Sequence, residues 1–259
     1  MMDEAKTGPA PVYFEGQGKF RGFTGNGLKL FAMAVMLVDH IAYSFQIYNS
    51  SAQVYLAMRI IGRFAFPIFA YMIAVGARHT HDIRKYLLRL FVFAFISELP
   101  FDLAFGFAGP GKWLEFTHQN VFFTLFLGLL VLALTQVFQK RLGRVYLIPS
   151  LAVLLLMMAA AEFLNTDYAG FGVLSIFLFY MGMAKDNNAR LPLFFAAIAV
   201  LAIDWAHLIN TTELFALAAL GPILLHNGQR GTKMNKWVFY VYYPGHLLAL
   251  YLIKLLVKG

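Results

Sequence analysis

The sequence contains no cysteine, which excludes disulfides, thiolate nucleophiles, Cys-ligated zinc and iron–sulfur clusters. Charged residues are also scarce: they make up 13% of the chain, whereas soluble domains carry about 25%. In their place the 259 residues are 60% hydrophobic and 17% aromatic, with a mean hydropathy of +0.67. These values exclude both a disordered chain and a single water-soluble core. The composition indicates a polytopic membrane protein.

The first 27 residues lack the apolar stretch of a cleavable signal, and glycine and proline punctuate them. We therefore expect a flexible N-terminal segment over 1–27 and one transmembrane domain over 28–259. The net charge of +8 would suggest nucleic acid in a soluble chain. Here the basic residues lie between apolar runs, so membrane topology explains them and no nucleic-acid partner is expected.

A membrane-crossing helix needs about 20 mostly apolar residues. Apolar runs between polar breaks predict an all-α bundle of about nine transmembrane helices, at 28–48, 53–76, 85–107, 119–138, 145–162, 168–184, 191–208, 212–226 and 237–257. The eighth segment is short and contains Gly221 and Pro222, so a re-entrant or kinked path is an alternative.

The connections between these segments alternate in charge. One set holds twelve basic residues and the other holds Lys112 alone, with Glu162, Asp167 and Glu213. The basic set is Arg78, Arg84, Lys85, Arg89, Lys140, Arg141, Arg144, Lys185, Arg190, Arg230, Lys233 and Lys236. Because short basic loops stay on the cytoplasmic side, nine spans with the N-terminus inside and the C-terminus outside fit every loop.

Several ionisable residues fall at membrane depth, where a charge costs at least about 2.5–3.5 kcal/mol and marks a functional candidate. Arg59 and Arg63 share one helix face, and so do Glu98 and Asp102, because each pair is spaced i,i+4. We expect the two cations to face the two carboxylates. A mutually satisfied structural network explains Glu98 and Asp102 equally well, whereas Arg63 favours a functional role because a guanidinium also binds carbonyl and phosphate oxygens.

Histidines and further polar groups share the middle-to-outer half of the membrane with these two pairs. His40 is at mid-membrane depth, and it is eleven residues from Lys29, which places the two on one helical stripe with Lys29 near the cytoplasmic surface. His246 follows Tyr242, Tyr243 and Pro244 at a predicted helix break. The others in this half are His118, Asn120, Asp204 and His207. A buried histidine can remove a proton from an amine or hydroxyl, but it can equally be a packed core residue.

The chain resembles the TraX family, named after the acetylase of F-type conjugative pilin. The resemblance lies in 28–43, 58–80, 84–105, 119–130, 167–176 and 239–253, and it is most specific from Arg59 to Asp102. TraX-like proteins are grouped with acyltransferase-3 proteins and with heparan-α-glucosaminide N-acetyltransferase. That grouping implies cytoplasmic acetyl-CoA as the acyl donor and an acceptor acylated at the opposite face of a bacterial inner membrane.

The acyltransferase-3 pattern, a basic residue, ten residues and then a catalytic histidine, is matched by Lys29 and His40. The resemblance thus implies a transmembrane O- or N-acetyltransferase with His40 as general base. The acceptor would be a pilin N-terminus or a cell-envelope glycan. A covalent acyl-histidine is the alternative chemistry.

The remaining candidates receive roles around this histidine. Arg63 is expected to stabilise carbonyl charge and Glu98 and Asp102 to position the arginines. Lys29, Arg59, Arg84 and Lys85 are candidates for binding the cofactor, although topology alone explains the last two. Asn120, Asp204 and His246 are candidates for binding the acceptor, and no metal is expected.

Two other functions use the same residues. A proton-coupled transporter would relay protons through His40, Glu98, Asp102 and Asp204. A haem or metal protein would use His40, His118, His207 and His246, but no two histidines share a helix face at i,i+4 spacing. A transporter would ignore acetyl-CoA and respond to a pH gradient, and a haem protein would be coloured.

Overall fold

The computed structural model describes residues 22–106, 113–204 and 208–258, and in them helices dominate. The α-helices are α1 (Gly25–Ser44), α2 (Ala52–Gly62), α3 (Ala65–His79), α4 (Ile83–Phe105), α5 (Val121–Leu142), α6 (Leu147–Phe163), α7 (Ala169–Gly182), α8 (Asn187–Ala199), α9 (Leu220–Leu224) and α10 (Trp237–Lys258). Short 3-10 helices are η1 (Ile47–Asn49), η2 (Gly143–Val145), η3 (Val200–Ala202) and η4 (Glu213–Ala219). Two-residue strands, β1 (Ile203–Asp204) and β2 (Leu208–Ile209), pair antiparallel.

Four helical stretches in the described residues are long and apolar enough to cross a membrane: Gly25–Ser44, Ala52–His79, Val121–Val145 and Trp237–Val257. Shorter apolar helices cover Leu147–Phe163, Ala169–Gly182, Asn187–Ala202 and Glu213–Leu224. The prediction of a helical membrane protein is confirmed, whereas the number nine stays a prediction. The helix expected at 191–208 ends earlier: the helical residues stop at Ala202, and strand β1 begins at Ile203.

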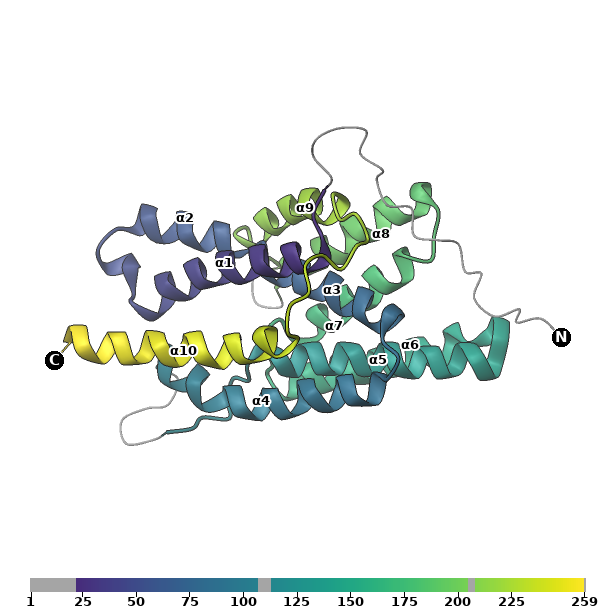
Figure 1. Cartoon of the computed structure of the whole chain (residues 1–259), viewed down its shortest axis with the longest axis horizontal. Helices are drawn as coiled ribbons and strands as arrows, with labels where there is room; N and C mark the ends of the chain where they lie inside the picture. The colour runs from purple at the N-terminus through teal and green to yellow at the C-terminus, as the bar shows by residue number, and fades with distance from the viewer. Residues whose placement is uncertain (1–21, 107–112, 205–207, 259) are drawn as a thin grey trace.

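The long helices form a bundle whose axes follow the long axis of the molecule (Figure 1). In that view α1, α4 and α10 run in the same direction, and α10 packs against both α4 and α1. On the other side of the bundle, α5 packs against α4, α6 and α7, and α3 packs against α1 and α7. This arrangement places α1, α3, α4, α5 and α10 around one central space.

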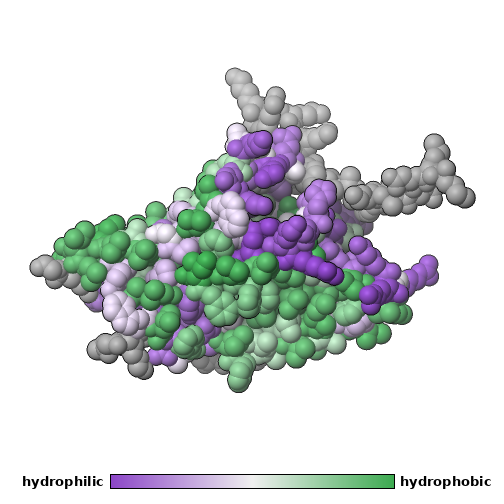
Figure 2. All heavy atoms as spheres, turned by 60° about the horizontal axis from the view of Figure 1, so that its bottom comes forward, coloured by the Kyte–Doolittle hydropathy of each residue, from purple (hydrophilic) through white to green (hydrophobic). Residues whose placement is uncertain are grey.

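Much of the outer surface of the bundle is apolar, as suits a surface that faces lipid chains (Figure 2). Figure 2 shows one such face, on which hydrophobic residues predominate and hydrophilic ones gather toward one side. Exposed apolar side chains lie on α4 (Leu88, Phe91, Val92, Phe95, Ile96, Leu99), on α6 (Leu151, Leu155, Leu156) and on α10 (Val241, Leu248, Leu252, Ile253, Leu255, Leu256). They give these helices a lipid-facing side and leave polar residues for the interior.

The second membrane stretch is broken between α2 and α3, at Arg63 and Phe64. Pro67 explains the break, because proline has no N–H to donate to the Arg63 carbonyl and its ring clashes with that carbonyl. Just before the break, Gly62 lies against α1, where a Cβ would stand 2.3 Å from the Cβ of Asp39. The glycine therefore permits the close approach of α1 and α2 that brings their charged residues together.

The first helix begins at Gly25, three residues earlier than the domain boundary expected at 28. The Thr24 hydroxyl accepts from the Gly27 amide and caps the helix, while the Phe23 amide donates to the Leu225 carbonyl over 2.8 Å. Residues 23–26 thus pair with the connection between α9 and α10. The rest of the predicted N-terminal segment, 1–21, lies outside the described residues.

Candidate functional site

A cavity of about 630 Å³ lies inside the bundle and runs along α1 from Gly25 to Tyr43. Residues of α2, α3, α4, α5 and α10 also line it, and so do His226 and residues 228–230. Four of the predicted site residues line it: Lys29, His40, Arg59 and Arg63. The predicted stripe of Lys29 and His40 therefore faces one continuous space.

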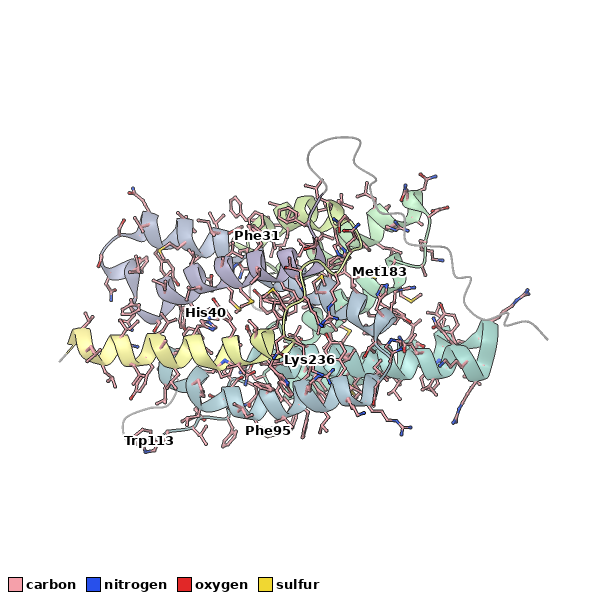
Figure 3. The ribbon with its side chains drawn as sticks, viewed as in Figure 1. Phe31, His40, Phe95, Trp113, Met183 and Lys236 are labelled. Carbon is pink, nitrogen blue, oxygen red and sulfur yellow. The ribbon has the colours of Figure 1, made fainter. Side chains whose placement is uncertain are left out.

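His40 lies where α1 faces α10 (Figure 3). Its Nδ1 is 2.8 Å from Nε2 of His246, and Nδ1 of His246 is in turn 2.8 Å from the carbonyl oxygen of Tyr242. The Phe105 and Tyr243 rings lie steeply inclined to the His40 ring, by 83° and 72°, with their centroids 5.1 and 6.1 Å from its centroid. The two histidines, 206 positions apart in sequence, thus form a pair beside the cavity.

The two arginines bind a carboxylate next to His40. Arg59 and Arg63 donate to the two oxygens of Asp39 over 2.7 and 2.8 Å. Arg63 also pairs with Glu213 from η4 and donates through Nε to the Arg59 carbonyl over 3.2 Å. The side chain of Arg63 is 9% exposed and that of Arg59 is 24% exposed. Arg59 is therefore the more accessible cation of the cluster.

The expected pairing of these arginines with Glu98 and Asp102 is wrong. The i,i+4 spacing correctly gave Arg59 and Arg63 a common face, but that face meets α1 and η4 rather than α4. The reason is packing: α2 lies against α1, whereas α4 lies against α5 and α10.

Glu98 and Asp102 instead hold the segment that leads into α5. Glu98 accepts from the side-chain amide of Asn120, and Asp102 accepts from the Glu115 amide over 2.7 Å. Asn120 also donates to the Ala94 carbonyl over 2.7 Å and caps α5 by accepting from the Phe122 amide. Glu98, Asp102 and Asn120 are buried and are not part of the cavity wall. Their contacts are those of a structural joint between α4 and α5.

One end of the cavity is basic and aromatic. Four cations line it there: Lys29, Arg89, Arg230 and Lys236. Three of them lie over aromatic rings at the start of α10. The Lys29 ammonium is 4.8 Å from the centroid of the Phe239 ring. The Arg89 guanidinium is 5.8 Å from the Tyr240 centroid, and the Lys236 ammonium is 5.9 Å from the Trp237 centroid. Figure 3 places Lys236 where α10 begins. We call this end, defined by those four cations, the basic mouth.

Two predicted cofactor-binding residues lie away from the cavity, and for two further candidates the structure describes no side chain. Arg84 and Lys85 are exposed on the first turn of α4 and do not line the cavity; Lys85 pairs with Asp82 over 3.2 Å. The Lys85 amide and then its ammonium hold the pKa of the Asp82 carboxyl below its usual value. Asp204 belongs to β1, but the structure does not describe its side chain, and His207 is not among the described residues.

Sequence reasoning missed several residues of the site. Asp39 could have been identified, because it is an acidic residue beside His40 at membrane depth. Its side chain points away from the histidine and binds the two arginines at the end of α2. Glu213 looked like a loop acid, because nothing local shows that η4 contacts the α2–α3 break. In the sequence, Arg89, Arg230 and Lys236 are charges of the basic connections, and only the fold brings them to one cavity.

Comparison with known proteins agrees with the resemblance seen in the sequence. The family described as "TraX protein" matches residues 24–254, which is most of the chain. A relative described as "Probable fimbrial assembly protein FimC, serogroup H1", from Dichelobacter nodosus, is 24% identical over 248 residues, which is 91% of this chain and 98% of the relative. No solved structure matches. The chain, a helical membrane protein with a histidine pair beside an internal cavity, belongs to the TraX family.

Proposed function

We propose that the protein transfers an acetyl group from acetyl-CoA to an amine or hydroxyl acceptor, with His40 as the general base. The observation that carries the proposal is the single cavity that joins the basic mouth to His40. Cations beside aromatic rings suit the phosphates and the adenine ring of a nucleotide. A histidine farther along the same space suits the thioester that a CoA molecule carries at its other end.

The reaction requires one bond to form and one to break. The acceptor nitrogen or oxygen attacks the thioester carbonyl while His40 removes its proton, and the C–S bond then breaks. The departing sulfur takes a proton, so the products are the acetylated acceptor and CoA. Charge that develops on the carbonyl oxygen needs a donor, and Arg59, the more accessible arginine, suits that role. Arg63, which two carboxylates engage, would hold the cluster together.

The acceptor is proposed to arrive from the side opposite the basic mouth. In the predicted topology the basic mouth faces the cytoplasm of a bacterium, where acetyl-CoA is made, and the protein spans the inner membrane. The name of the FimC relative concerns fimbrial assembly, which favours the N-terminal amine of a pilin as acceptor. An amine or hydroxyl of a cell-envelope glycan is the alternative acceptor for the same chemistry.

The test follows CoA release by the purified full-length protein in detergent, with acetyl-CoA and a pilin-derived peptide or an amino sugar. His40→Ala should abolish release, because the base is lost, while calorimetry should still detect acetyl-CoA binding. His81→Ala is the matched control: His81 is exposed and does not line the cavity, so turnover should persist. Absence of both binding and release by the wild-type protein would contradict the proposal.

A further inference from the structure

We infer that His246 is a positioning residue that fixes which nitrogen of His40 carries the proton; the inference rests on the acyltransfer proposed above. The sequence suggested contact with the acceptor for His246. In the structure, His246 is buried at 9% exposure, and each of its two ring nitrogens already has a partner. It therefore acts through another residue.

The direction of the first hydrogen bond follows from the chemistry of its partner. Nδ1 of His246 lies 2.8 Å from the carbonyl oxygen of Tyr242, and a carbonyl oxygen can only accept. Nδ1 of His246 must therefore carry a hydrogen and donate it. In a neutral imidazole the other nitrogen is then an acceptor, so Nε2 of His246 presents a lone pair.

That lone pair determines the state of His40. Nδ1 of His40 is 2.8 Å from Nε2 of His246, so Nδ1 of His40 must be the donor. The two rings are inclined by only 12° with their centroids 5.0 Å apart, so they meet edge to edge and the N–H and the lone pair share one plane. With both rings neutral, the lone pair of His40 is on Nε2, and His40 itself lines the cavity.

The consequence for catalysis is that His40 is already in the tautomer that can act as the base. Without His246, neutral His40 would divide itself between two tautomers, and only the one with unprotonated Nε2 can accept a proton from a nucleophile at that atom. When Nε2 takes the proton, Nδ1–H still donates to His246, so the new imidazolium keeps a strong hydrogen bond. The last hydrogen bond of the series lies within α10, because Tyr242 is four residues, or one helical turn, before His246.

The decisive measurement is ¹⁵N NMR of the ring nitrogens in full-length protein labelled at histidine, with the His40 signals assigned by their loss in His40→Gln. We expect a protonated Nδ1 and an unprotonated Nε2 in the wild-type protein. In His246→Phe, which keeps a flat ring but no acceptor, the signals should shift toward the other tautomer. A wild-type His40 that is protonated at Nε2 and not at Nδ1 would overturn the inference.

Kinetics separate positioning from packing. His246→Phe should lower kcat about 100-fold while KM for acetyl-CoA changes less than about twofold, because the cation-lined mouth is intact. His246→Gln, whose amide oxygen can stand in for Nε2 as an acceptor, should recover kcat to within about tenfold of wild type. Equal kcat values for the Phe and Gln variants would contradict a role for the acceptor atom.

The two proposals fail in different ways. If the wild-type protein releases no CoA yet shows the expected His40 tautomer, the positioning by His246 stands and acetyl transfer falls. If CoA is released but His246→Phe retains both kcat and the tautomer, acetyl transfer stands and the positioning falls. Should His246→Phe fail to fold, the wild-type spectrum alone still decides the tautomer.

Discussion

Arg63 and Glu213, 150 positions apart in the sequence, form a buried ion pair between the α2–α3 break and the 3-10 helix η4. Arg63 also binds Asp39 of α1, so one guanidinium joins three parts of the chain. The cluster is nearly closed to solvent, with about a tenth of the Asp39 and Glu213 side chains exposed. A buried pair of this kind is more informative about which segments meet than about net stability.

Removing one partner of this network should be costly. We expect Arg63→Met to lower the free energy of unfolding by about 3–5 kcal/mol, because Glu213 then remains buried without its cation. The double variant Arg63→Met/Glu213→Met should recover part of the loss, since Asp39 still has Arg59. Thermal unfolding in detergent measures both. The exposed pair Lys85–Asp82 supplies the control: Lys85→Met should leave the melting temperature unchanged.

The contact of α1 with α2 should tolerate no side chain at Gly62. A Cβ there would stand 2.3 Å from the Asp39 side chain, so Gly62→Ala should destabilise the protein by about 1–3 kcal/mol through overpacking. Gly245→Ala is the matched control, because a Cβ at Gly245 meets nothing within 4 Å. Alanine should stabilise that helical position by up to about 1 kcal/mol. A neutral Gly62→Ala would show that the two helices are not in close contact.

The joint between α4 and α5 should matter for folding rather than for chemistry. We expect Asn120→Ala to cost about 1–3 kcal/mol, because it removes the α5 cap and the donor to Glu98. Glu98→Gln keeps an acceptor for Asn120 and should retain kcat near the wild-type value. A loss of kcat in Glu98→Gln at unchanged melting temperature would instead restore Glu98 to the catalytic group.

The basic mouth should control donor binding. Lys29→Gln and Lys236→Gln should each raise KM for acetyl-CoA several-fold with little change in kcat, because each removes a cation far from the histidine pair. Higher salt should weaken wild-type binding more than binding by the variants, since screening acts on the charges that the variants lack. Lys140→Gln, an exposed site outside the cavity, should have neither effect.

His226 should make stability depend on pH. It lies in the connection after α9, where burial, with smaller contributions from His79 and Lys29, lowers its pKa to about 4. Its unfolded pKa is about 6.5, so between those values the unfolded chain binds the extra proton. Stability is therefore complete above about pH 6.5 and falls as the pH drops toward 4.

Melting temperatures measured between pH 7.5 and pH 4.5 test this dependence. His226→Asn keeps a short polar group near the Tyr71 hydroxyl, which is 2.9 Å from Nδ1 of His226, but cannot take up a proton. The variant should show a shallower fall in melting temperature over this range. Parallel curves for the two proteins would assign the acid sensitivity to other groups.

The local sequence pattern correctly predicted which polar residues of the site share a helix face. Helical period alone placed Lys29 and His40 on one stripe, and both line the cavity. The i,i+4 rule likewise gave Arg59 and Arg63 one face, and both bind Asp39. These predictions hold because they depend on geometry within one helix, which the sequence spacing sets directly.

By itself, the sequence determined the membrane class, the helical fold and which polar residues share a helix face, because hydropathy and helix period are properties of neighbouring residues. The tertiary structure decided their partners: Asp39 and Glu213 for the arginines, Asn120 for Glu98, and His246 for His40. Such pairs form where distant helices bury their surfaces against each other. That choice depends on the packing of the whole bundle, and no local spacing encodes it.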